Sequence, residues 1–189
     1  AHAIILGAEP PIDTPEADKP PPPMDETLSA RLPLTPEDEA FLADLHQAAS
    51  PELPEALIRR AQDLSPALVP ALIGIVNDDD LWDPAAKPGR GWPPIHAVSL
   101  LGYLRAAQAV SLLIDLVVEF DDNAEGHYRA SEALGLIGPP AAEAILLEMK
   151  YGTDRAAKVA LAAALAIAGR GDSRAVTPLI DLFNSANWR

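Results

Sequence analysis

Two stretches of sequence, YRASEALGLIG at residues 128–138 and SRAVTPLIDL at residues 173–182, decide the fold of this chain. In both, apolar residues recur three and four positions apart, which predicts amphipathic helices. The pattern of the second stretch returns upstream as ALVPALI at residues 67–73, AVSLLI at 109–114 and AAEAIL at 141–146. The copies are separated by intervals in the low thirties, with one longer interval across an insertion, and this period is typical of helical repeat proteins.

A further helix precedes three of these copies. The predicted first helices cover residues 95–104, 128–137 and 157–168, and each ends near a glycine that can form a left-handed C-cap. One helical hairpin cannot bury its apolar face alone, whereas stacked hairpins share one continuous core. The sequence therefore predicts an all-α fold, an α-α superhelix of about four helical hairpins.

The repeat domain begins with a clear helix start at residues 35–38, Thr-Pro-Glu-Asp. Threonine can cap free amides, proline suits the first helical position, and acidic residues favour the positive end of the helix. The predicted helix runs to about residue 49. Ser-Pro pairs at residues 50–51 and 65–66 repeat this punctuation, so the next two helices are predicted over residues 51–64 and 66–76.

Residues 1–34 form a different region, rich in proline, aspartate and glutamate, with four consecutive prolines at residues 20–23. Such a composition buries too little apolar surface to offset the entropy of ordering. We therefore predict a disordered tail or linker at residues 1–34 and a repeat domain at residues 35–189. The proline run suits either a spacer or a ligand for an aromatic groove, and its acidic neighbours favour the spacer.

The amino-acid composition disfavours several classes of binding partner. The formal net charge of -14 opposes binding to nucleic acid and to anionic lipid, because both depend on clustered lysine and arginine. No apolar stretch reaches the length of a membrane span or of a signal peptide, so we expect a cytoplasmic protein that binds neither membrane nor nucleic acid. The chain has no cysteine, which excludes disulfides, thiolate metal sites and a cysteine nucleophile.

Residues 128–138 and 173–182 resemble the first and second helices of the HEAT-like repeats found in bilin lyase relatives and in bacterial scaffold proteins. The resemblance is good over residues 92–183 and weak over residues 51–76. It implies a right-handed superhelix of paired helices that serves chiefly as a protein-binding surface.

We recognise no catalytic or metal-binding motif in the sequence. Di-iron hydroxylases built on similar repeats carry His-Glu pairs where this chain has Tyr128 and Arg129, with His127 one place too early. The acidic run at residues 78–83 lacks the alternation and glycine of a calcium loop. Arg-Gly-Asp at residues 170–172 is accounted for as the turn of the last hairpin. We therefore assign no catalytic, metal or cofactor residues and expect a non-enzyme.

The insertion at residues 81–94 is the one segment that the repeat does not explain. Tryptophan and arginine on a loop are frequent in binding hot spots, and solenoid insertions project from one face. The alternative is that the tryptophans fold back as a lid on a hairpin. The candidate partner-binding residues, including two on helices nearby, are Trp82, Arg90, Trp92, His96 and Arg129.

The last predicted helix, residues 173–183, keeps an apolar face where a solenoid needs a polar cap. This face predicts either self-association with a second copy or continuation into further repeats. As a whole, the sequence indicates a non-catalytic scaffold or adaptor for a protein partner. The alternatives are a bilin-lyase-like or other HEAT-repeat enzyme subunit, and a structural subunit of a larger assembly.

Overall fold

The computed structural model describes residues 33–85, 87–119, 124–152 and 155–185. All regular elements among these residues are helical, which confirms the all-α prediction. Most of the predicted tail, residues 1–32, lies outside the described residues. The α-helices are α1 (Pro36–Gln47), α2 (Glu55–Gln62), α3 (Leu68–Val76), α4 (Trp92–Tyr103), α5 (Val110–Glu119), α6 (Ala124–Ile137), α7 (Pro139–Tyr151), α8 (Arg155–Ala168) and α9 (Val176–Ser185). Short 3-10 helices are η2 (Asp79–Trp82), η3 (Ala107–Ala109) and η4 (Ser173–Ala175).

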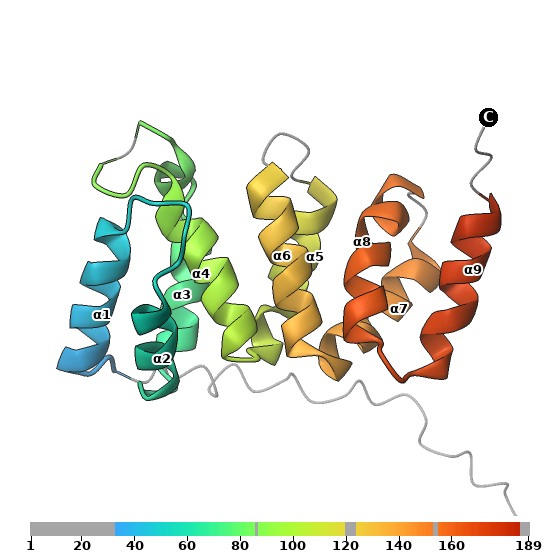
Figure 1. Ribbon diagram of the computed structural model, residues 1–189, viewed down its shortest axis with the longest axis horizontal. Helices are drawn as coiled ribbons and strands as arrows, with labels where there is room; N and C mark the ends of the chain where they lie inside the picture. Colours follow the sequence, from blue (N-terminus) through green and yellow to red (C-terminus); the bar gives the residue numbers. More distant parts are fainter. Residues whose placement is uncertain (1–32, 86, 120–123, 153–154, 186–189) are drawn as a thin grey trace, which may run out of the picture. The chain divides into compact units, whose positions relative to one another are not determined.

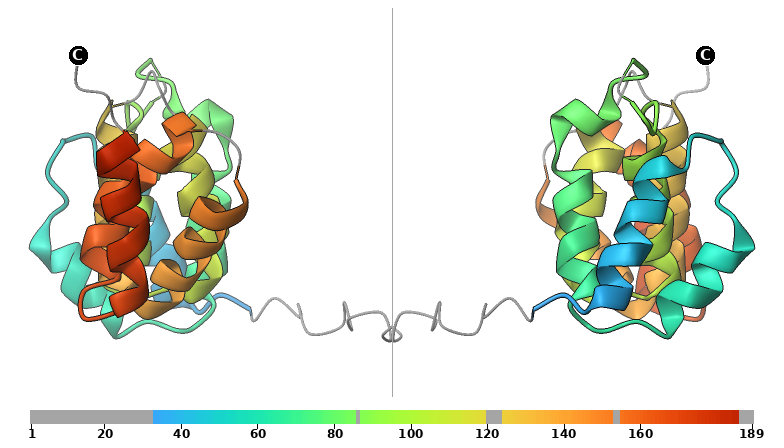
Figure 2. Two further views of the ribbon diagram at one scale, coloured as in Figure 1. Left: turned by 90° about the vertical axis from the view of Figure 1, so that its right-hand side faces the viewer. Right: turned by 90° about the vertical axis from the view of Figure 1, so that its left-hand side faces the viewer.

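The α-helices of the repeat domain form two layers (Figure 1). In the first layer α4 packs on α6 and α6 on α8, and in the second α5 contacts α7 and α7 contacts α9. Along the chain each first helix is followed by a second helix, giving the successive hairpins α2–α3, α4–α5, α6–α7 and α8–α9. The most extensive contacts between the layers join each second helix to the next first helix, in the pairs α3–α4, α5–α6 and α7–α8. The helix α1 precedes them and lies at the opposite end from α9 (Figure 2). The prediction of about four stacked hairpins is confirmed.

The core lies between the two layers and runs without interruption through the hairpins. Leucine and isoleucine from successive helices are fully buried there, together with alanine from the same helices. The leucine and isoleucine side chains that are 0% exposed in the last three hairpins are Leu100, Leu101, Leu113, Leu134, Ile145, Leu161 and Leu165. Each hairpin therefore depends on its neighbours for much of its apolar burial, as expected of a solenoid.

Small residues set the spacing of the first layer. A Cβ atom placed on Gly102 of α4 would lie 2.6 Å from Cα of Ala133 on α6. A Cβ atom on Gly135 of α6 would lie 2.6 Å from Cγ2 of Ile167 on α8. These contacts leave no room for a methyl group, so glycine permits both the α4–α6 and the α6–α8 packing.

Helices α2 and α6 begin four residues away from their predicted starts, and α4 begins at Trp92, three residues before its predicted start. Ser50-Pro51 does not begin a helix; the Ser50 hydroxyl donates to the Glu52 carbonyl, and α2 begins only at Glu55. Proline at position 54 explains the delay, because the residue before a proline avoids the helical conformation. Helix α6 begins at Ala124, four residues before its predicted start, so His127 lies within it.

Asp38 joins the start of α1 to the turn between α2 and α3. Thr35 caps α1 as predicted: its hydroxyl accepts from the Asp38 amide, and its own amide donates to the Asp38 carboxylate at 2.8 Å. The amide and the hydroxyl of Ser65 also donate to this buried carboxylate. Burial raises the pKa of Asp38, but the hydrogen bonds from Ser65 and Thr35 outweigh it, so the pKa lies below its usual value of 3.8.

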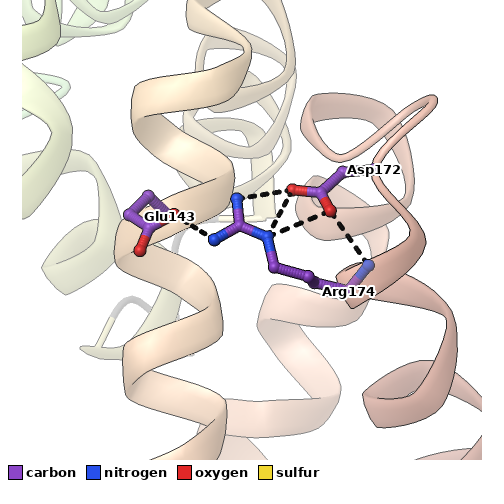
Figure 3. A network of polar contacts seen from close by, with 3 residues as sticks. All are labelled: Glu143, Asp172 and Arg174. Carbon is purple, nitrogen blue, oxygen red and sulfur yellow. Dashed lines mark hydrogen bonds and ion pairs between the residues drawn. The ribbon is translucent and has the colours of Figure 1, made fainter.

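The turn of the last hairpin is held by Arg174 (Figure 3). Its guanidinium contacts Glu143 of α7 at 2.8 Å and Asp172 at 2.8 Å, while the Asp172 carboxylate also accepts from the Arg174 amide. Hydrogen bonds from Arg174 hold the pKa of Asp172 below its usual value. Asp172 of the Arg-Gly-Asp tripeptide is thus engaged within the hairpin, in the turn role predicted for it.

Substituting Gly102→Ala should destabilise the domain, because the new methyl group meets the backbone of α6. We expect a loss of about 1–3 kcal/mol in the free energy of unfolding, measured by urea denaturation. Gly74→Ala is the matched control: Gly74 lies inside α3 with nothing within 4 Å of its Cβ position. That variant should gain about 0.5–1 kcal/mol. Equal effects at both sites would contradict the close α4–α6 contact.

Substituting Asp38→Ala should lower the free energy of unfolding by about 2–3 kcal/mol, because it removes a capping box and leaves partly buried donors on Ser65 unpaired. The exposed neighbour serves as the control, and Glu39→Ala should change stability by less than about 0.5 kcal/mol.

The effect of Asp38→Ala should also depend on pH. Because the folded-state pKa is lowered, Asp38 contributes its full stability above about pH 4, and the contribution disappears as the pH falls through the folded-state pKa. The difference between wild type and Asp38→Ala should therefore shrink in acid. A difference that stayed constant down to pH 2 would show that the carboxylate charge is not involved.

Candidate functional site

An exposed apolar row crosses the first layer of the solenoid. It consists of Tyr103 on α4, Leu136 on α6 and Ile167 on α8, and each of these side chains is between 43% and 45% exposed. Large apolar residues exposed at one position of several consecutive hairpins form a continuous feature rather than scattered surface residues. We call these three residues the apolar row.

The row follows from the register of the repeat. In α4 the sequence Leu101-Gly102 precedes Tyr103, and in α6 Leu134-Gly135 precedes the row residue. Each leucine is fully buried between the layers, and each glycine packs against the next first helix. Each residue advances about 100° around a helix, so the residue after the glycine turns outward.

A groove of about 580 Å³ runs beside the row. It spans the first helices of several hairpins and reaches the segment before α2. Its lining residues are Glu52, Leu53, Ile58, Ser99, Tyr103, Arg129, Glu132, Ala133, Gly135, Leu136 and Ile167. Apolar side chains from different hairpins thus line one depression together with a few charged groups, which is the usual composition of a recognition surface.

Arg129 is the only one of the predicted partner-binding residues that lines this groove. Its guanidinium contacts Glu125 at 2.8 Å and Glu132 at 3.2 Å, and lies 5.7 Å from the ring centroid of Tyr128. Burial lowers the pKa of Arg129, but the two carboxylates outweigh it and raise the pKa overall. The hydrogen bond to Glu132 raises the pKa of the Tyr128 hydroxyl.

The charges around the groove are therefore acidic in balance. Three carboxylates, those of Glu52, Glu125 and Glu132, line the groove or pair with Arg129, and they face a single guanidinium among the groove-lining residues. A partner with basic side chains complements this arrangement better than an acidic one.

The two tryptophans of the insertion are turned toward the domain. The indole nitrogen of Trp82 donates to the Val76 carbonyl at 2.9 Å, and its ring packs against the core. Trp92 is the first residue of α4 and stacks on His96, with ring centroids 6.1 Å apart. Both rings are partly buried, which is the arrangement expected of a lid.

His96 lies in the core rather than on a surface. Its side chain is 1% exposed, and Nε2 has no hydrogen-bond partner among the described residues. Burial lowers the pKa of His96, a hydrogen bond with the Ser50 backbone opposes this, and the charge of Arg129 lowers it further. Because a partner cannot reach this ring, we leave His96 out of the candidate site, contrary to the prediction.

Arg90 is exposed and has a positive φ of 54°, in the insertion just before α4. The structure thus buries His96, partly buries Trp82 and Trp92, and leaves Arg90 exposed. None of the four lines the groove. The row was not predicted from the sequence, although its signal is present: a large apolar residue follows Leu-Gly or Leu-Ala at the end of three first helices.

In the described part of the chain, no group of three or more histidine, aspartate or glutamate side chains has an arrangement that could hold a metal ion. None of the helices described has the length and apolar content needed to cross a membrane.

Comparison with known proteins gives one family match. The model of the PBS lyase HEAT-like repeat matches residues 159–185, a segment that contains most of α8 and all of α9. No curated protein and no solved structure matches the chain. The matched segment is one helix pair at the end of a stack whose preceding helices lie in the same two layers, so the match and the all-helical fold both support a HEAT-like repeat architecture.

Proposed function

We propose that this repeat domain is a non-catalytic scaffold or adaptor that binds a protein partner across its first helices. The observation that carries the proposal is the apolar row of Tyr103, Leu136 and Ile167 beside a groove shared by several hairpins. Large side chains held on rigid helices lose little entropy on binding and provide apolar area in the centre of an interface.

The distance between residues of the apolar row limits the spacing of apolar residues in a partner segment that would bind it. Packed helices lie about 8–10 Å apart, so neighbouring row residues are separated by about that distance. A polyproline II segment presents every third residue on one side at about 9 Å intervals, and an α-helix presents every seventh at about 10 Å. We therefore infer a partner segment with apolar residues at one of these spacings, accompanied by basic residues that meet the acidic groove.

The name of the matching family supports a second candidate, a bilin-lyase-like subunit. Such a subunit would hold a linear tetrapyrrole, and visible absorbance of the chain purified from its native source would reveal it. A bound pigment that is lost in variants of the groove would replace the scaffold proposal.

The variant Leu136→Glu tests the scaffold proposal, because a charge in the centre of the row would be buried against an apolar partner. A partner is captured from native lysate with the intact chain, purified, and titrated against each variant by calorimetry. We expect Leu136→Glu to weaken binding about 30-fold or more, equivalent to about 2 kcal/mol.

Leu147→Glu is the matched control, since Leu147 is also exposed but lies on α7 in the second layer. This variant should bind with unchanged affinity, and both variants should keep wild-type helical circular dichroism. Equal binding by wild type and Leu136→Glu would place the interface elsewhere and remove the row from the proposal.

A further inference from the structure

A second groove, of about 750 Å³, lies between α7 and α9 in the last two hairpins. Half-buried apolar side chains of both helices line it, among them Leu146, Pro178 and Leu182. None of its lining residues is shared with the groove beside the apolar row. The two grooves are therefore separate surfaces, one on the first helices and the other mainly on the second helices.

The charged side chains of this second groove reverse the balance of the whole chain. The sequence contains 14 lysine and arginine residues against 28 aspartate and glutamate residues. Four basic residues but only two acidic ones line the groove, namely Lys150, Arg155, Lys158 and Arg174 against Glu143 and Asp181. We call this surface the basic groove.

Three of the cations, Lys150, Arg155 and Lys158, lie at one end of the basic groove. Lys150 is in the last turn of α7, and the other two are in the first turn of α8, which begins shortly after α7 ends. A hydrogen bond of 2.8 Å from Arg155 to the Ser185 carbonyl brings the end of α9 to the same place. We call these three cations the cationic end.

No described carboxylate pairs with the cationic end. None of its three residues forms an ion pair within the described part of the chain. Lys150 lies 4.9 Å from the ring centroid of Tyr151, and Arg155 is bonded to a neutral carbonyl. At the other end of the groove, by contrast, Arg174 is paired with Glu143 at 2.8 Å (Figure 3). The cations available to a partner therefore lie at one end.

Local helix stability does not explain these cations. A helix start carries a partial positive charge, so basic residues in the first turn destabilise a helix. Helix α8 has Arg155 and Lys158 there and no acidic residue, whereas α1 has three acidic residues in its first turn. Departures from such local rules are concentrated at functional sites, and a bound anionic group would offset the unfavourable charge.

We propose that the basic groove binds an acidic amphipathic segment of a protein partner. The carboxylates of this segment form charge-assisted hydrogen bonds with the cationic end, and its apolar side chains cover Leu146, Pro178 and Leu182. From Glu143 to Lys150 the groove follows α7 for about 10 Å, which accommodates about two turns of a helix laid along it. This interaction goes beyond the proposed function, because its surface and the charge of its partner are both different.

Other anionic partners fit the basic groove less well. Binding of nucleic acid depends on cations spread along the phosphate backbone, whereas here the cations are gathered at one end. A small anion such as inorganic phosphate meets the cations but leaves the apolar side chains uncovered. An acidic amphipathic segment engages both parts of the groove at once.

The first measurement uses a fluorescein-labelled helical peptide with three glutamates at one end and leucines spaced three and four residues apart beyond them. Its titration with the full chain, followed by fluorescence anisotropy, should give a dissociation constant of about 100 µM or lower. A matched peptide with glutamine in place of glutamate should bind about 10-fold more weakly. Because the net charge of -14 repels the glutamate peptide at long range, this preference requires a local basic surface.

The variant Lys158→Glu should weaken binding of the glutamate peptide about 10-fold or more, because it reverses a charge in the cationic end. Arg170→Glu is the matched control: Arg170 is an exposed residue of the last hairpin that does not line the groove, and the change in net charge is the same. Since glutamate suits the first turn of a helix, thermal unfolding should show Lys158→Glu to be at least as stable as wild type. Its loss of binding is then not a loss of folding.

A third peptide, with serine in place of the leucines, distinguishes a peptide groove from a site for small anions. It should bind about 10-fold more weakly than the leucine peptide, because it cannot cover the apolar side chains. The proposal is overturned if the glutamate peptide binds no more tightly than the glutamine peptide, or if Lys158→Glu binds it as well as wild type does. Equal binding of the serine peptide, or its displacement by inorganic phosphate alone, would also overturn it and indicate a simple anion site.

Discussion

The close contact between successive first helices is the constraint on which the rest of this structure depends. Gly102 and Gly135 allow α4, α6 and α8 to pack with no room for a methyl group between them. This approach brings the preceding leucines, Leu101 and Leu134, into full burial between the layers. The hairpins therefore stack at a fixed distance, and every surface feature that repeats along the stack inherits that distance.

The repeated helical register places apolar side chains at equivalent positions of successive helices, both in the first layer and in the second. At the ends of α4 and α6, burial of a leucine and close packing of the following glycine turn the next side chain outward, and Ile167 of α8 completes the apolar row. On the second helices, Val176 of α9 repeats an apolar position that is buried at Val110 of α5 and Ala142 of α7. Both features follow from the repeated sequence, because an apolar position recurs along the stack wherever the register is kept.

Two arginines each form ion pairs with two carboxylates, so these surface clusters keep a negative charge. Arg129 is shared by Glu125 and Glu132, and Arg174 is shared by Asp172 and Glu143. Exposed pairs of this kind add little stability, but they hold side chains in defined orientations. Since acidic groups outnumber basic ones by 14 over the whole chain, its average electrostatic field attracts cationic groups and repels anionic ones.

The sequence by itself determined the helical class, the hairpins and the cap at Thr35, because apolar spacing and capping residues act over a few positions. It did not reveal the late start of α2, where Pro54 overrides the Ser50-Pro51 signal. Only the tertiary structure decided which residues a partner can reach. Helical spacing leaves open which way a face turns, and packing between hairpins buried His96, folded Trp82 onto the core and left Tyr103, Leu136 and Ile167 exposed.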